Sequence, residues 1–180
     1  MKPLRSIAGV TNSYSRRILS HVVDRDSVKI LETTARRLKV LTRGLGERQS
    51  RLSPVSGKWS IHQIVCHLAD VEVVFGFRLR MVIAQSGTTL QAMDEKLWAG
   101  NLGHEKDRLR DKIEVFEGMR RDHVRMLRRL PRAAWKRFGM HQERGKETIE
   151  RMVHMYAGHD LNHLEQVRSI RRLLRKGSTR

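Results

Sequence analysis

Apolar side chains recur every three or four positions along four long stretches of this chain. This spacing places them on one face of an α-helix, because successive residues advance by about 100° around the helix axis. We expect helices over residues 26–41, 60–85, 105–130 and 146–175, and no stretch of useful length shows the two-residue period of a β-strand. The pattern predicts an all-α fold, a four-helix bundle with a long crossover connection between the second and third helices.

The second of these helices has the clearest beginning. Ser60 followed by Gln63 is typical of a capping box, in which each side chain accepts a hydrogen bond from the other residue's backbone amide. Trp59 precedes the cap and can pack against Ile64. Gly76 lies inside the helix, where we expect it to permit the close approach of a neighbouring helix rather than to break this one.

The chain divides into three parts of unequal length. Its 180 residues are the size of a single domain. We predict a basic N-terminal arm or extra helix over residues 1–25, the bundle over residues 26–176 and a tail over residues 177–180. The arm has the acid-poor composition of a transit peptide, although a basic arm is the interpretation we favour. Residues 86–103 form a connection long enough to indicate a crossover or a functional segment.

The chain is strongly basic, with 37 Lys and Arg against 19 Asp and Glu, a net charge of +18. Such a charge predicts non-specific attraction to polyanions such as nucleic acid. The basic residues are spread over all the expected helices, and the sequence contains no helix-turn-helix signature, zinc-finger spacing or aromatic RNA-binding motif. Nucleic-acid binding as the main function is therefore an alternative rather than our first interpretation.

The single cysteine, Cys66, excludes a disulfide framework and a CxxC zinc ribbon, and it fits a reducing compartment. We expect it to be a small buried residue rather than a nucleophile. No run of apolar residues approaches the length of about 18 that a membrane-spanning helix requires, so we expect no membrane association. Together these features predict a cytoplasmic protein.

Helix geometry singles out three of the nine histidines. His159 and His163 are four residues apart, so they stack on one face of the last helix together with apolar residues such as Val167. Two imidazoles on a buried face are unfavourable without partners, and an inward-facing pair can supply two ligands to one metal ion. His67 lies at the edge of the apolar face of the second helix and can face the last one. Hydrogen-bonded core histidines are the alternative to a three-histidine metal site.

The segment from His159 to His163 also resembles the HExxH motif of zinc metalloproteases, with Asp160 in place of the glutamate. Aspartate is one methylene shorter and would reach a metal-bound water less well. A third ligand downstream is also missing, since Glu165, the candidate in the remaining residues, is turned off the histidine face. The sequence therefore disfavours a metalloprotease.

Two motifs resemble the DinB-like (YfiT-like) superfamily of metal-dependent hydrolases. Residues 57–72 read GKWSIHQIVCHLADVE and look like that family's second helix, where a Trp-Ser cap precedes a His-Leu-Ala-Asp segment. Residues 159–167 read HDLNHLEQV and are similar to the His-x-x-x-His-x-x-Gln pattern of its fourth helix. The resemblance covers residues 26–175 and includes neither the basic arm nor the unusually high charge.

This resemblance implies a four-helix bundle in which His67, His159 and His163 hold a divalent metal ion, with zinc or nickel as the ions we expect. It also suggests a homodimer and a small-molecule substrate. Because family members include transferases and isomerases that use low-molecular-weight thiols, the resemblance implies either a hydrolase or a thiol S-transferase.

Three neutral imidazoles would leave the charge of such an ion uncompensated. The ion could then polarise a carbonyl group or lower the pKa of bound water towards about 7. It could equally hold a thiolate, because soft sulfur suits Zn²⁺ and similar ions. A non-catalytic stress-response or binding module of the same fold remains an alternative to an enzyme.

Spacing also suggests which residues orient the imidazoles. Gln166 lies three positions after His163, on the same helix face, and is a candidate to hold an imidazole in place. Glu72 and Asp160 are further candidates because they are near the expected ligands in the sequence, although their positions turn them away from the ligand faces.

Overall fold

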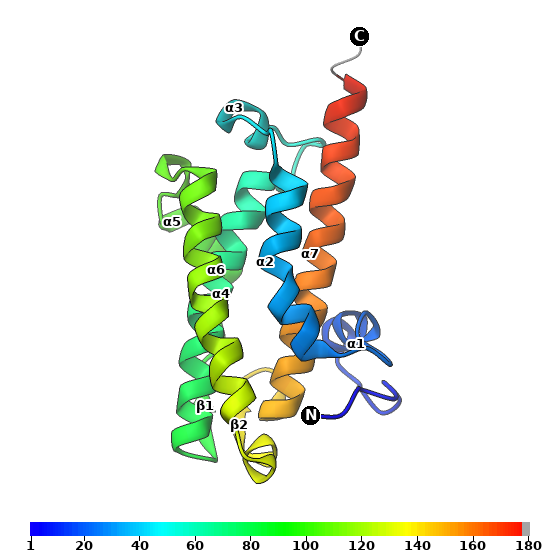
Figure 1. Ribbon diagram of the computed structural model, residues 1–180, viewed down its shortest axis with the longest axis vertical. Coiled ribbons are helices and arrows are strands. Elements are labelled where there is room, and N and C mark those ends of the chain that lie inside the picture. Colours follow the sequence, from blue (N-terminus) through cyan, green and yellow to red (C-terminus); the bar gives the residue numbers. More distant parts are fainter. Residues whose placement is uncertain (178–180) are drawn as a thin grey trace.

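The computed structural model describes residues 1–177 and contains the four expected long helices (Figure 1). Their bounds differ from the expected ones by a few residues at most. They are α2 (Ser27–Thr42), α4 (Ile61–Ala84), α6 (Leu109–Arg129) and α7 (Ile149–Gly177).

These four helices form a bundle in which α2 and α4 each pack against both α6 and α7. Helices α2 and α7 run in one direction, whereas α4 and α6 run in the other (Figure 1). Because α4 and α6 are consecutive and parallel, the chain between them has to return along the whole length of the bundle. The predicted fold class, a four-helix bundle with a long crossover between its second and third helices, is confirmed.

The crossover contains β1 (Thr88–Leu90), the short helix α5 (Glu95–Asn101) and the 3₁₀-helix η1 (His104–Lys106). Its end is fastened to the bundle by the ring of His104. That ring lies 2.7 Å from Asp70 Oδ2 on α4 and 3.0 Å from Asp107 Oδ2. The contact holds the crossover against α4 close to His67, one turn before Asp70.

A small sheet, which the periodicity of the sequence did not indicate, closes one end of the bundle. It joins β1 to β2 (Phe138–His141) in parallel, and β2 to β3 (Gly145–Thr148) in antiparallel pairing. Each strand has three or four residues. Segments this short do not develop a detectable two-residue period, and β1 in addition depends on pairing with the distant β2. The remaining short elements are α3 (Glu47–Ser50) and η2 (Arg132–Lys136).

The N-terminal residues pack onto the bundle rather than extending from it. They contain α1 (Ser13–Ser20), which lies against α7. The side chains of Ile18 and Leu19 are completely or almost completely buried. A Cβ added at Gly158 of α7 would lie 2.2 Å from the carbonyl oxygen of Ile18, so only glycine permits this approach. The division at residues 25 and 176 stays a prediction, and residues 178–180 of the predicted tail lie outside the described residues.

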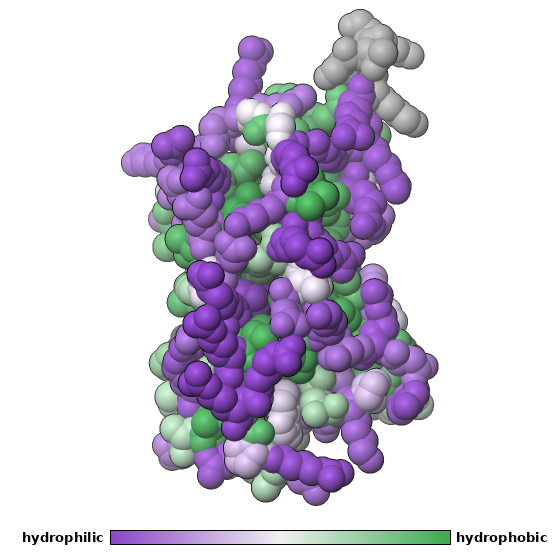
Figure 2. All heavy atoms as spheres, in the orientation of Figure 1, coloured by the Kyte–Doolittle hydropathy of each residue, from purple (hydrophilic) through white to green (hydrophobic). Residues whose placement is uncertain are grey.

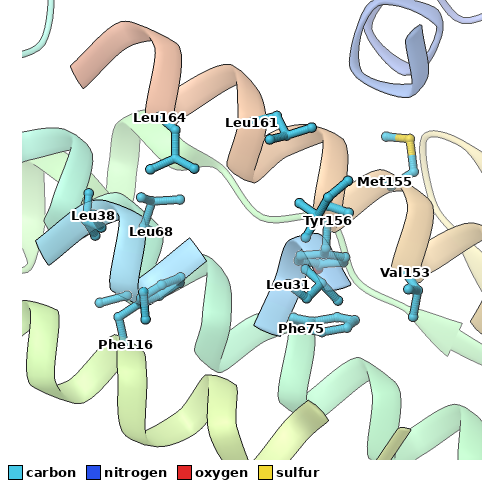
Figure 3. Packing of buried hydrophobic residues seen from close by; sticks show 14 of the residues in the cluster. Leu31, Leu38, Leu68, Phe75, Phe116, Val153, Met155, Tyr156, Leu161 and Leu164 are labelled. Carbon is cyan, nitrogen blue, oxygen red and sulfur yellow. The ribbon is translucent and has the colours of Figure 1, made fainter. Parts of the chain in front are cut away.

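The core is built from all four bundle helices. The rings of Phe75 and Tyr156 stack with centroids 4.0 Å apart. Gly76 permits the close packing expected of it, because an added Cβ would lie 2.1 Å from His123 Nε2 on α6. Figure 3 shows apolar side chains of the four helices pointing towards one another, among them Leu31, Leu38, Leu68, Phe116, Leu161 and Leu164.

The outer surface reflects the high charge of the chain. Figure 2 shows hydrophilic side chains over most of the face that carries α2 and α6, with small apolar patches between them. Within residues 1–177, no helix combines the length and the apolar character that crossing a bilayer requires.

Candidate metal centre

Three imidazole rings from two distant segments converge between α4 and α7. His67 Nε2 lies 3.1 Å from His159 Nε2, which in turn lies 3.0 Å from His163 Nε2. All three side chains are buried. Their ligand atoms all lie within 4.8 Å of one another, which is close enough for one ion to contact all three.

The beginning of α4 positions both the first histidine and the residue that covers it. The expected capping box is present, with the Gln63 amide donating to Ser60 Oγ (3.2 Å) and the Ser60 amide donating to Gln63 Oε1 (2.9 Å). The ring of Trp59, just before the cap, stacks on His163 (centroids 6.4 Å) and tilts against His67 (4.8 Å). The position of Trp59 before the cap predicted only packing against Ile64, and nothing in the local pattern indicated that its ring covers the imidazoles.

Burial keeps the three rings neutral. It lowers the pKa of His67 to about 3, with a smaller contribution from the charge of His163. It lowers the pKa of His163 itself to about 4. The pKa of His159 also falls well below its usual value, first because of burial and then because of its two histidine neighbours. Neutral imidazoles each offer one nitrogen lone pair, which is the form that binds metal ions.

Gln166 takes the place that its spacing predicts. Its Oε1 lies 2.9 Å from His163 Nδ1, so the ring donates its Nδ1 proton to the amide oxygen. In the neutral ring this leaves the lone pair on Nε2, which points towards His159. Gln166 therefore fixes the tautomer in which His163 can act as a ligand through Nε2.

Hydrogen bonds alone do not satisfy this cluster. With the proton of His163 on Nδ1, its Nε2 can only accept, and His159 Nε2 cannot donate to both neighbours at once. His159 Nδ1 is also buried without a hydrogen-bond partner. A tetrahedral ion with bonds of about 2.0–2.1 Å separates its nitrogen ligands by roughly 3.3 Å, slightly more than the spacings here. The donor set therefore fits a divalent ion.

Two of the three candidates for orienting the imidazoles do not reach them. Glu72 accepts hydrogen bonds from Arg120 Nη2 and His123 Nδ1, both at 2.6 Å, and Asp160 accepts from Arg120. The interpretation of Glu72 and Asp160 as partners of the imidazoles is corrected accordingly. The physical reason is Arg120, whose buried guanidinium needs both carboxylates. Its position on α6 gave no sign in the sequence that it is buried.

One carboxylate that the sequence did not single out lies near the rings. Glu95 Oε2 is 3.9 Å from His67 Nε2. Glu95 is the first residue of α5, and this helix is capped by Asp94, whose side chain accepts from the amides of Lys96 and Leu97. No sequence pattern predicts how far a crossover residue lies from the bundle, so sequence reasoning missed it.

Two cavities meet at the imidazoles, and His159, Tyr14 and Glu95 line both of them. The smaller one has a volume of about 100 Å³ and extends along α4 and α7 towards the sheet. The larger one has a volume of about 540 Å³. Its wall combines apolar and cationic side chains, among them Trp59, Ile170, Leu173, Arg17 and Lys58.

A second cluster, Cys66 with His104 and Asp107, has ligand-type atoms at similar spacing. Its groups are already satisfied, because both nitrogens of His104 face carboxylates and Lys112 Nζ lies 2.9 Å from Asp107 Oδ2. Burial raises the pKa of the Cys66 thiol to about 12, so it stays protonated. The expectation that Cys66 is a small buried residue is confirmed.

Comparison with known proteins gives concordant matches. The sequence model of the DinB superfamily matches residues 30–167. A protein of Oceanobacillus iheyensis, provisionally described as a metal-dependent hydrolase, is 25% identical over 152 residues, covering 84% of this chain and 88% of its own length. A second protein from that organism with the same description is 26% identical over 145 residues, covering 78% and 81%.

A solved structure shares the fold. YfiT from Bacillus subtilis, described as having an unusual four-helix bundle topology, superposes on this chain with a TM-score of 0.78. The two are 20% identical, and the match covers 98% of this chain and 94% of that one. The bundle, the crossover and the N-terminal segment therefore belong to an architecture that is already known.

Proposed function

Because the chain belongs to the DinB superfamily, we propose that it is a divalent-metal-dependent hydrolase whose ion is held by His67, His159 and His163. The observation that carries this proposal is the convergence of three buried Nε2 atoms at the junction of two cavities. The relatives described as metal-dependent hydrolases support it further.

A bound ion at this place would act as a Lewis acid on a substrate carbonyl and activate a water molecule. The chain supplies the conditions for that chemistry. Gln166 holds the ring of His163 in the ligating tautomer. Trp59 covers the imidazoles of His67 and His163 on one side. Three neutral ligands leave the charge of the ion available to the substrate.

Zinc and nickel are the ions that we propose, because both accept imidazole ligands readily. The site also suits a second candidate reaction, the transfer of a low-molecular-weight thiol, whose thiolate could occupy the open position. The size of the larger cavity, about 540 Å³, favours keeping this candidate, since a transferase needs room for two reactants. The cytoplasmic location and the homodimer remain predictions.

The test begins with the metal content of protein purified without a histidine tag. We expect one divalent ion per chain, lost in His163→Ala while the helical circular dichroism signal is kept. His21→Ala is the matched control, because His21 lies at the end of α1 outside the cluster. Unchanged metal content in His163→Ala would reject the site.

The metal-loaded protein is then assayed against a panel of small esters and amides, and in parallel for thiol transfer. Hydrolysis that disappears on chelation and returns with the ion supports a hydrolase. A chain that binds the ion and catalyses neither reaction is a binding module, and the enzymatic proposal fails.

A further inference from the structure

The crossover brings a single unsatisfied carboxylate to the mouth of the candidate metal centre. Glu95 Oε2, at 3.9 Å from His67 Nε2, is the nearest carboxylate oxygen to the three imidazole nitrogens within residues 1–177. The side chain is 57% exposed, and with His159 it lines both cavities. It therefore lies where an ion bound by the histidines would be open to solvent and substrate.

No cationic side chain of residues 1–177 pairs with this carboxylate, although the chain has a net charge of +18. Within the described residues, Glu95 accepts no hydrogen bond and forms no ion pair with a lysine or arginine. Asp94 rather than Glu95 caps α5. Instead, Glu95 Oε2 lies 3.9 Å from Nε2 of the buried His67. A carboxylate oxygen facing an imidazole nitrogen at this distance is an arrangement that a cation bound between the two would stabilise.

We propose that Glu95 is a fourth, exchangeable protein ligand of the divalent ion, an inference that rests on the proposed three-histidine site. Carboxylate oxygens bind zinc at about 2.0–2.2 Å beside histidine nitrogens. The exposed glutamate is free to rotate the short distance towards the ion that this requires. Its negative charge offsets part of the charge that three neutral imidazoles leave uncompensated.

The position of Glu95 in the chain is the reason to expect that it can be displaced from the ion. The three histidines are buried on the rigid bundle helices, whereas Glu95 lies at the start of a seven-residue helix in the crossover. A donor atom of the substrate can displace it into solvent without disturbing the bundle. The carboxylate would thus close the site at rest and open a coordination position when substrate enters.

The test compares Glu95→Gln with Glu105→Gln, since both variants remove one negative charge from the same crossover. Glu105 is exposed in η1 and lines neither cavity, so it controls for the change in net charge. Zinc affinity is measured by competition with a chromogenic chelator, and Co²⁺ is used as a spectroscopic substitute. We expect Glu95→Gln to weaken zinc binding at least about tenfold and to change the visible Co²⁺ spectrum.

Glu105→Gln should bind zinc within about twofold of the wild type and leave the Co²⁺ spectrum unchanged. Equal affinities and spectra in all three proteins would overturn the proposal and reduce Glu95 to a favourable charge at the start of α5. These readouts report ligation rather than turnover. A negative result would therefore leave the three-histidine site and its hydrolysis assay intact, whereas a wild type that binds no ion would reject both.

Discussion

Gln166 Oε1 accepts a hydrogen bond from His163 Nδ1 at 2.9 Å, one turn further along the same helix. This contact connects the backbone geometry of α7 to the chemistry of the site. A spacing of three residues places the amide beside the ring, and the bond decides which ring nitrogen keeps its lone pair. Orientation of the ligand is therefore encoded locally, within a single helix.

Replacing Gln166 with leucine should weaken metal binding without unfolding the protein. The variant keeps the size of the side chain but leaves the His163 tautomer unfixed, and we expect a loss of affinity of about 10–100-fold. Chelator competition measures it. Glu165→Gln is the control, because Glu165 pairs with Arg168 on the surface. Equal affinities for the Gln166→Leu variant and the wild type would contradict the orienting role.

Replacing Arg120 with alanine should be strongly destabilising. The variant leaves the buried carboxylates of Glu72 and Asp160 without their counter-charge. Removal of one partner from such a buried network costs about 3–5 kcal/mol of the free energy of unfolding. Urea denaturation at neutral pH measures this cost. A loss below about 1 kcal/mol would show that water or His123 compensates the two acids.

A rescue experiment distinguishes two causes of the destabilisation by Arg120→Ala, the unpaired charges of the carboxylates and the lost packing of the arginine side chain. Adding Glu72→Gln and Asp160→Asn to Arg120→Ala neutralises both acids while keeping their shapes. We expect the triple variant to recover part of the lost stability, because no buried charge remains unpaired. No recovery would assign the loss to the missing arginine side chain as a packing element.

How much the sequence predicts depends on the range of the interactions involved. The four long helices follow from periodic apolar positions and from local caps such as Ser60 with Gln63. The pairing of His159 with His163 and the position of Gln166 also follow from spacing along one helix. Each of these features is fixed by residues a few positions apart.

Features that depend on contacts between distant segments were missed or misassigned. Glu95 reaches the site because the crossover is fastened by His104 to Asp70, and no local pattern encodes that contact. Arg120 redirects Glu72 and Asp160 from across the bundle. The strand β1 likewise depends on a distant segment, because its only partner in the sheet is β2.

Two helical glycines give opposite predictions for the same substitution. Gly76→Ala should destabilise the protein, because the added Cβ would lie 2.1 Å from the His123 ring and force α4 and α6 apart. Gly118→Ala on α6 meets no atom within 4 Å and should stabilise the protein by about 0.5–1 kcal/mol. Thermal or urea unfolding of both variants measures the difference. Similar effects of the two substitutions would contradict the close helix contact at Gly76.

The buried imidazoles predict that the metal-free protein loses stability as the pH falls below 6.5. The folded state holds the pKa of His67 at about 3 and that of His163 at about 4, whereas both titrate near 6.5 when unfolded. Between these values the unfolded chain binds more protons, so acid favours unfolding. Each such histidine contributes up to about 1.4 kcal/mol per pH unit.

Urea unfolding of chelator-treated protein at several pH values between 7.5 and 4.5 measures this slope. Carboxylates also titrate in acid, so the wild type is compared with His163→Asn. This variant removes one histidine whose pKa is lowered in the folded state, and its free energy of unfolding should therefore change less steeply with pH. Identical slopes in the two proteins would contradict a buried, neutral His163.

With zinc bound, the ligands must also release the ion as they are protonated, so the stability of the loaded protein should fall more steeply than that of the metal-free protein. Retention of the ion at about pH 4 would argue against ligation by histidine.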